Sequence, residues 1–208
     1  MMVQQMGVTR ERHDAGGNDY NSRFVARRGA DCLPENEAAM IGPLWCRTMA
    51  RYNLWQNRAI IAAADPLGAL VRQTDRGAAF QSISGTLSHL LWTDRVWMAR
   101  FDGGAAPDGD LAGSSLRFQD WQMYRTERAQ TDTRILDWAS TLDAAALEGE
   151  LFWMSKSVAR HVSRPIAICV THFFVQQAHH RGVVHALLGA AGAVVEDSAL
   201  FLMPDLLE

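Results

Sequence analysis

Histidines gather near the C-terminal end of this 208-residue chain. Four of its seven histidines fall within fourteen residues, namely His172, His179, His180 and His185. Histidine is a common metal ligand and proton carrier, so the cluster raises the expectation of a site. Each histidine taken singly is better explained as a surface residue of a helix. Which of the four could bind a metal therefore depends on which of them lie on the inner face of that helix.

Two polar residues interrupt the apolar stripe of the predicted last helix, which runs from about Pro165 to Leu188. The stripe steps by alternating threes and fours. It comprises Ile166, Cys169, Phe173, Gln176, His180, Val183 and Leu187. Gln176 and His180 are four residues apart, so they lie about 6 Å apart along the axis and on one face. A buried polar side chain needs a partner or a ligand, and this spacing offers two ligands to one ion, as in HExxH.

A third ligand has to come from a facing helix. His89 is the single histidine of the predicted second helix, and apolar residues surround it in the sequence. A lone histidine in such a place is more often a core residue whose hydrogen bonds are satisfied. Beside Gln176 and His180, His89 becomes the expected third ligand.

Three segments, in order along the chain, resemble the DinB family of helical-bundle proteins. They are MARYNLWQNR (49–58), GTLSHLL (85–91) with the following Asp94, Arg95 and Trp97, and HFFVQQAHHRGVVHALL (172–188). The resemblance covers about residues 43–190. It implies a bundle, often dimeric, in which three histidines hold zinc or nickel, one on the second helix and two on the last. It also implies the activity of a thiol transferase or isomerase that uses a low-molecular-weight thiol such as mycothiol, bacillithiol or glutathione.

The family motif, carried over to this sequence, makes His89 and His180 metal ligands and places Gln176 at the middle ligand. Family members have histidine there, and a glutamine offers only a weak amide oxygen to metals that favour imidazole. Val175 and Val183 also replace the usual Asn and Gln of the motif. Two outcomes follow from these changes. Either the three residues and water hold the metal weakly, or the site is lost and only the fold is kept.

Other polar residues are candidates to support or replace these ligands. Asp94, His179 and Arg181 are candidates to hold the ligands in place, although structural pairing or exposed surface charges explain Asp94 and Arg181 equally well. His172 is a candidate substitute ligand. It lies about 12 Å from His180 along the helix axis, so direct sharing of one ion would be awkward.

A site that still holds its metal would have an open coordination position, where the ion would lower the pKa of a bound water or thiol. The resemblance then implies a metal-dependent thiol S-transferase or hydrolase that acts on small molecules. The alternative is a non-catalytic dimeric bundle with a degenerate site, which binds a small molecule or a partner protein. The sequence has no P-loop, GxGxxG or Ser-His-Asp order that would favour another chemistry.

Four long helices have to position these residues. Hydrophobic periodicity and breakers place them at about 41–63, 78–101, 114–142 and 165–188, with a short hairpin or irregular connection over 147–164. The expected fold is all-α, a four-helix bundle of the DinB/YfiT-like type. On the third helix, Arg128 and Asp132 share the inner stripe, either as a solvated ion pair or as the lining of a polar pocket.

The bundle is expected over residues 41–190, between two segments of different composition. Residues 1–40 lack sustained periodicity and are expected to form a flexible extension. Residues 191–208 are small and apolar, then acidic, and are expected to pack on the bundle as a tail. Trp45, Tyr52 and Trp55 give the first helix more aromatic surface than one small bundle needs, and together with the resemblance they predict a homodimer.

Composition excludes several classes of protein. With 48% hydrophobic and 21% charged residues, a chain disordered throughout is excluded. A net charge of -3 gives no sign of nucleic-acid binding. Cys32, Cys46 and Cys169 form no CxxC pair, which suits a reducing cytoplasm. We expect no membrane span, because no apolar run reaches about 18 residues. We expect no secretory signal, because no apolar segment follows a basic stretch near residue 1.

Overall fold

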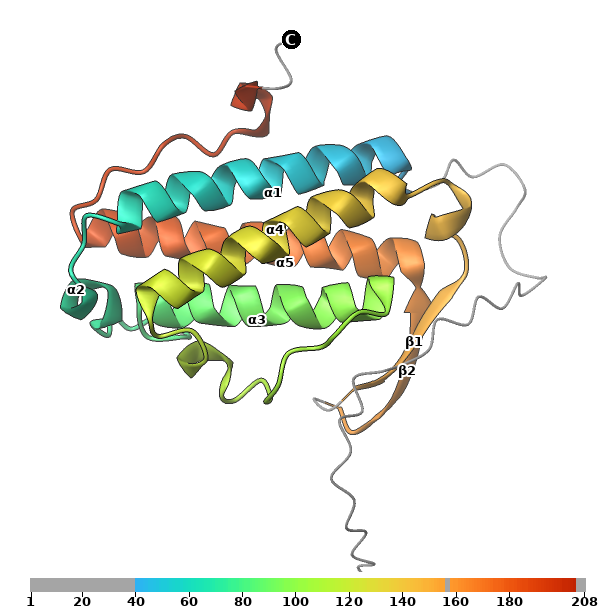
Figure 1. Cartoon of the computed structure of the whole chain (residues 1–208), viewed down its shortest axis with the longest axis horizontal. Helices are drawn as coiled ribbons and strands as arrows, with labels where there is room; N and C mark the ends of the chain where they lie inside the picture. The colour runs from blue at the N-terminus through green and yellow to red at the C-terminus, as the bar shows by residue number, and fades with distance from the viewer. Residues whose placement is uncertain (1–39, 156–157, 205–208) are drawn as a thin grey trace, which may run out of the picture.

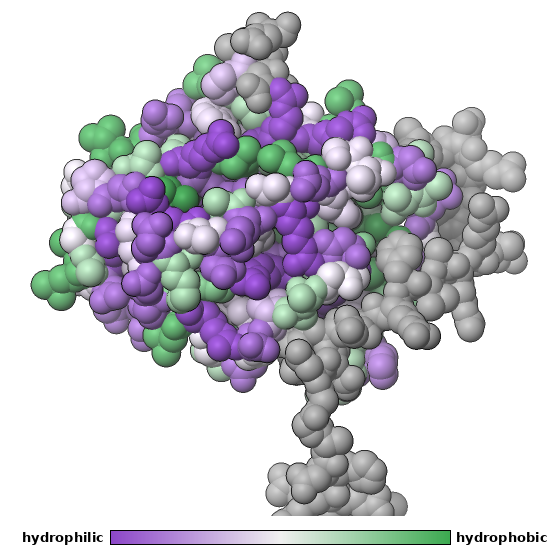
Figure 2. All heavy atoms as spheres, viewed as in Figure 1, coloured by the Kyte–Doolittle hydropathy of each residue, from purple (hydrophilic) through white to green (hydrophobic). Residues whose placement is uncertain are grey.

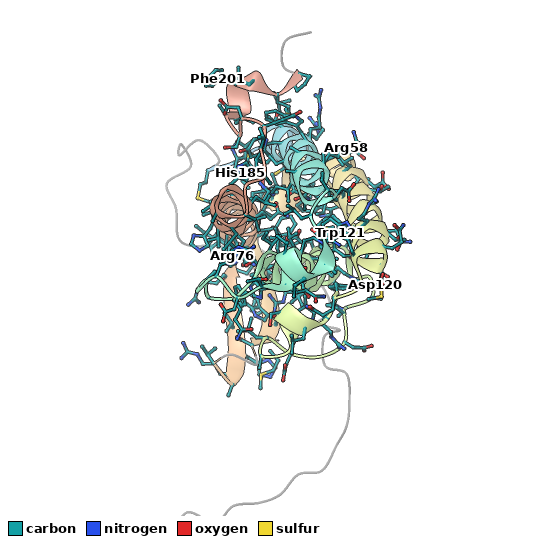
Figure 3. All side chains as sticks on the ribbon, turned by 90° about the vertical axis from the view of Figure 1, so that its left-hand side faces the viewer. Arg58, Arg76, Asp120, Trp121, His185 and Phe201 are labelled. Carbon is teal, nitrogen blue, oxygen red and sulfur yellow. The ribbon has the colours of Figure 1, made fainter. Side chains whose placement is uncertain are left out.

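Four long helices surround a common core in the computed structural model, which describes residues 40–155 and 158–204 (Figure 1). They are α1 (Pro43–Ala64), α3 (Ile83–Asp102), α4 (Trp121–Thr141) and α5 (Ile166–Ala190). The view along the bundle in Figure 3 shows their side chains converging between the four ribbons. The predicted all-α bundle is confirmed. Except for Met40, the predicted extension lies outside the described residues.

Local chemistry sets the helix ends. Pro43 opens α1, where its missing N–H costs nothing. The Ser82 side chain caps α3 by accepting a hydrogen bond from the Gly85 N–H at 3.0 Å. Asp120 caps α4 in the same way. Gly103, in the left-handed conformation at φ 71°, ends α3.

Two helices begin later than the sequence predicts. The second predicted helix was expected from residue 78, but a tight turn holds residues 76–82, with the Arg76 N–H donating to the Gln81 carbonyl at 2.8 Å. The third was expected from residue 114, but Ser114–Leu116 forms a separate short helix, η1. A further short helix, α2 (Ala69–Gln73), follows α1. Both segments, the turn over residues 76–82 and η1, contact His89.

The connection before the last helix is a β-hairpin. Strands β1 (Glu150–Ser155) and β2 (Arg160–Pro165) pair antiparallel, with Glu150 opposite Pro165. A 3₁₀ turn, η2 (Ala145–Leu147), precedes it. The hairpin projects beside one end of α3 and leads directly into α5 (Figure 1).

The bundle core has two apolar clusters with a polar layer between them. One cluster, around Phe173 and Phe174, lies toward the hairpin, and the other, around Leu87 and Leu188, lies toward the opposite end. Between the clusters, each of the four helices contributes buried polar side chains to this layer. They are Asn53 and Asn57 of α1, Asp94 of α3, Arg128, Thr131 and Asp132 of α4, and Gln177 and Arg181 of α5.

The segment after α5 runs back over α1 (Figure 1). The Tyr52 hydroxyl donates to the Ser198 carbonyl at 2.6 Å, and the Gln56 amide donates to the Asp197 carbonyl at 3.3 Å. The Met203 side chain is buried, and a last 3₁₀ turn, η3 (Leu200–Leu202), precedes it. The face drawn in Figure 2 mixes polar and apolar side chains. No described helix is long and apolar enough to cross a membrane.

Candidate metal centre

His89 and His180 meet where α3 crosses α5. Their ring centroids lie 4.8 Å apart, with the ring planes at 73°. His89 is only 4% exposed, and His180 is half-buried. Two turns further along α3, Trp97 meets His172 at 5.2 Å, which fixes the antiparallel register of the two helices. The two histidines predicted as ligands on different helices are therefore brought together.

Ser114 of η1 orients the His89 ring through a hydrogen bond. The Ser114 Oγ lies 2.8 Å from His89 Nδ1 and donates its own proton to the Leu111 carbonyl at 2.7 Å. The hydrogen-bond network therefore assigns a donating Nδ1–H to His89. The Nε2 atom then carries a lone pair, the form in which histidine binds a metal. Ser88 fixes the turn by donating to the Ser114 carbonyl at 2.6 Å.

Both imidazoles are neutral at neutral pH. Burial lowers the pKa of His89 to about 4, and the nearby His180 adds to this effect. Burial likewise lowers the pKa of His180 to about 4, with His179 as the second cause. Because metal binding requires neutral imidazole, no proton has to be displaced at pH 7.

Phe80 covers the histidine pair. Its ring stacks on His89 with centroids 3.7 Å apart and meets the His180 ring at 5.6 Å. The turn before α3 presents this ring, with Gln81 at a positive φ of 65°. Gly85 is required there, because a Cβ atom at residue 85 would lie 2.2 Å from the Phe80 carbonyl oxygen. Phe80 was not predicted from the sequence, because no metal-ligand pattern contains it.

Gln176 lies one helical turn from the histidine pair. It is half-buried and lines a cavity together with Thr93 of α3. The helix register explains this, because Thr93 follows His89 by four residues and Gln176 precedes His180 by four. Gln176 therefore flanks the buried stripe, which passes through its neighbour Gln177.

The remaining histidines of the C-terminal cluster do not join the pair. His172 and His179 are exposed and His185 is half-buried, although the His179 ring lies 5.0 Å from that of His180. Among residues 40–155 and 158–204, no group of three or more His, Cys, Asp or Glu side chains could hold a metal. The described part of the chain thus offers two converging imidazoles and, one turn away, the Gln176 amide.

The family model described as "DinB family" matches residues 40–202. The chain belongs to the DinB family. The match spans all four helices of the bundle, the hairpin and most of the described C-terminal segment. A search among curated proteins found no match.

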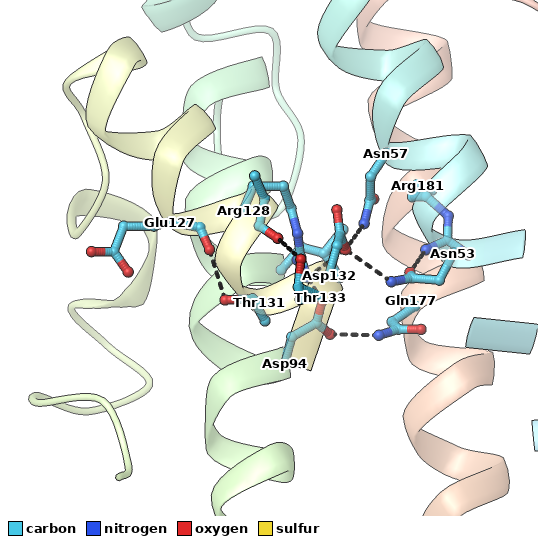
Figure 4. A network of polar contacts seen from close by, with 12 residues as sticks. Asn53, Asn57, Asp94, Glu127, Arg128, Thr131, Asp132, Thr133, Gln177 and Arg181 are labelled. Atoms are coloured by element: carbon cyan, nitrogen blue, oxygen red, sulfur yellow. Dashed lines mark hydrogen bonds and ion pairs between the residues drawn. The ribbon is translucent and has the colours of Figure 1, made fainter. Parts of the chain in front are cut away.

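The DinB bundle carries a buried ionic network (Figure 4). Two of its members, Asp94 and Arg181, lie on the helices that carry His89 and His180. Arg128 is fully buried and contacts Asp94 at 2.6 Å and Asp132 at 2.9 Å. The predicted solvated ion pair of Arg128 and Asp132 is therefore wrong. Asp94 and Arg181 are buried as well, so their interpretation as exposed surface charges is also wrong.

Three amides complete this network. Asp132 accepts hydrogen bonds from Asn57 at 2.8 Å and Asn53 at 3.3 Å, and Asn53 in turn accepts from Arg181. Gln177 donates to Asp94 at 3.0 Å. For two of these amides the sequence holds a signal. Asn53 and Asn57 are four residues apart, between the apolar residues Ala50 and Ile60, so they lie on one face of the helix.

Burial and ion pairing act in opposite directions on the charges of the network. Burial raises the pKa of Asp132 to about 6, against the lowering effect of Arg128. Burial alone would lower the pKa of Arg128, but Asp132 and Asp94 raise it above its ordinary value. Burial also lowers the pKa of Arg181 to about 10. Ion pairing thus favours the charged forms of Arg128 and Asp132, and burial opposes it.

Proposed function

We propose that this chain binds a divalent transition metal, zinc or nickel, through His89 and His180. We further propose that it uses the metal in a thiol S-transfer or hydrolysis reaction of a small molecule. The observation that carries the proposal is the pair of neutral imidazoles from antiparallel helices, with centroids 4.8 Å apart. Membership of the DinB family supports it.

The donor set fits a metal that accepts imidazole. Zinc and nickel favour imidazole nitrogen, and a Zn–N bond is about 2.0–2.1 Å, so one ion could reach both rings. The His89 Nε2 lone pair, oriented through Ser114, is one donor. His180 is the second donor, and the Gln176 oxygen, water or a substrate thiol would supply the others. A metal held there lowers the pKa of a bound water or thiol and makes it a nucleophile at neutral pH.

The surrounding side chains would orient the ligands and exclude water. Ser114 fixes which His89 nitrogen faces the ion. Phe80 covers both rings and limits the access of solvent from its side. Gln176 lines the neighbouring cavity one helical turn from His180, so it is the residue of that cavity on α5 that lies nearest in sequence to the proposed metal ligand.

The second candidate function is a non-catalytic bundle with a degenerate site. Two observations favour it: no third His, Cys, Asp or Glu ligand is present among the described residues, and Phe80 stacks directly on His89. The homodimer stays a proposal that rests on the family. The aromatic residues of α1 already have partners in the chain, since Trp45 packs on Phe174 and Tyr52 bonds to Ser198.

Metal analysis of untagged protein separates the two candidates. We expect wild-type protein to bind zinc or nickel, and His89→Ala and His180→Ala each to weaken binding by more than tenfold, because each change removes an imidazole donor. His161→Ala is the matched control. It removes an exposed histidine of strand β2, which is not part of the histidine pair, and should leave metal affinity unchanged.

The measurement is isothermal titration with zinc and with nickel, followed by elemental analysis of the dialysed protein. A wild-type protein that retains neither metal after exposure to an excess would support the non-catalytic bundle. Unchanged binding in both alanine variants would place the metal elsewhere in the chain.

A further inference from the structure

A cavity of about 220 Å³ lies along α3, between the loop before η1, the hairpin and α5. Its walls are largely aromatic and apolar, and among the residues that the structure describes its charged members are Arg100 and Asp110. The lining residues that carry the argument are Trp92, Val96, Trp97, Arg100, Met154 and Gln176. Its volume is below the roughly 300–1,000 Å³ of pockets for drug-sized ligands, so its occupant is a small molecule.

Arg100 is held at this cavity by two indole rings. Its guanidinium carbon lies 4.5 Å from the Trp97 ring centroid and 5.1 Å from that of Trp153. Cation–π attraction to both rings keeps the guanidinium at this cavity. A guanidinium carries a planar set of N–H donors that suits bidentate recognition of a carboxylate.

The other charged group of the cavity has a local structural role. The Asp110 carboxylate accepts the Gly113 N–H at 2.9 Å, which closes the turn before η1. The Trp92 indole N–H holds the same loop by donating to the Asp108 carbonyl at 3.0 Å. The wall opposite the hairpin is thus fixed in place before any ligand enters.

The two ends of the cavity are lined by different residues. The lining residues of α3 from Trp92 to Arg100 follow one face of the helix, so Arg100 is at the end distant from His89. Gln176 lines the cavity from α5, at the level of Thr93 and one turn from His180. A molecule bound along the cavity would have one end at Arg100 and the other toward the histidine pair.

We propose that this cavity binds a small organic acid with an apolar body. Its carboxylate pairs with Arg100, its body lies against Trp92, Trp97 and Met154, and its other end points past Gln176. Only the role of that last end rests on the proposed metal function. Binding of the acid itself does not require a metal.

The test compares three probes of nearly equal shape on the full chain, with EDTA present, by tryptophan fluorescence titration at neutral pH. They are 3-phenylpropanoate, 3-phenylpropanamide and 3-phenylpropan-1-amine. We expect the acid to bind at least tenfold more tightly than the amide, because its carboxylate forms charge-assisted hydrogen bonds. The amine should bind most weakly of the three.

Arg100→Met should remove the preference for the acid over the amide. Arg95→Met is the matched control on α3, because Arg95 pairs with Glu127 at 2.5 Å and does not line the cavity. It should keep the preference. Val96→Phe, which fills the cavity, should weaken all three probes whether or not Arg100→Met folds.

Equal affinities for acid and amide, a preference for the amine, or no saturable binding would each overturn the proposal. His89→Ala separates this proposal from the metal function. If it binds the acid as wild type does while losing zinc, the cavity and the metal site are independent. If zinc binding fails in the wild type but the acid binds, only the metal function is contradicted.

Discussion

Arg128→Met should lower the free energy of unfolding by about 3–5 kcal/mol, because it leaves buried carboxylates without their cation. Arg128 is fully buried and contacts Asp94 and Asp132, which are also buried. A loss of this size is a large share of the roughly 5–15 kcal/mol that stabilises a typical protein. The melting temperature should fall by on the order of 10 °C, measured by circular dichroism alongside chemical denaturation.

The same helix offers a matched control for this substitution. Arg134 of α4 also pairs with an aspartate of α3, Asp102, at 2.6 Å, but both side chains are about a quarter exposed. Arg134→Met should therefore cost only about 0.2–1 kcal/mol. Arg128→Lys, which keeps the charge, should lose less than Arg128→Met. Similar small losses for Arg128→Met and Arg134→Met would show that the network contributes little to stability.

The network explains why this bundle tolerates charges in its centre. Two arginines and two aspartates balance one another there, and the amides of Asn53, Asn57 and Gln177 supply further hydrogen bonds. Shifting any helix along its axis would bring these groups into the apolar clusters on either side. Burial of unpaired charge is costly, so the polar layer favours one alignment of the four helices.

The helices and the hairpin were predictable from local chemistry. Breakers such as Asp65-Pro66, together with apolar spacing, located the four long helices, and the interrupted apolar run before Pro165 indicated a hairpin or irregular connection. The motifs brought His89 and His180 into one expected site, and the structure places them in contact. The motif does not predict that the Phe80 ring covers the two histidines, because that contact depends on the conformation of the turn before α3.

The phase of the buried stripes was predicted less well. Trp45, Tyr52 and Trp55, the aromatic residues on which the predicted dimer contact rests, are partly buried within the chain, while the buried face of α1 carries Cys46, Asn53 and Asn57 among others. Large amphipathic rings lie at the flanks, where they remain partly exposed, while small and amide side chains fit the centre of the bundle. On α5 the same shift places Gln177 in the buried layer and Gln176 at its edge.

Gln176→His should create a tighter metal site without a change of the backbone. The contacts of His89 with His180 and of Trp97 with His172 set the register of α3 against α5. In that register residue 176 lies level with Thr93, one turn from both histidines. A histidine there adds a third imidazole, a stronger donor for zinc and nickel than an amide oxygen. Because only the folded state binds, zinc should stabilise the variant by roughly 3 kcal/mol at a hundredfold excess over Kd.

Val175→His is the control for this gain. Residue 175 is 59% exposed on the same helix, so a histidine there adds a surface imidazole that cannot join the pair. Zinc titration and thermal unfolding with and without zinc should show gains for Gln176→His and none for Val175→His. If Gln176→His gains neither affinity nor zinc-dependent stability, residue 176 does not face His89 and His180, and its assignment as the third ligand position is wrong although the fold is right. Equal gains in both variants would mean that zinc binds surface histidines, since exposure rather than position would then decide the affinity.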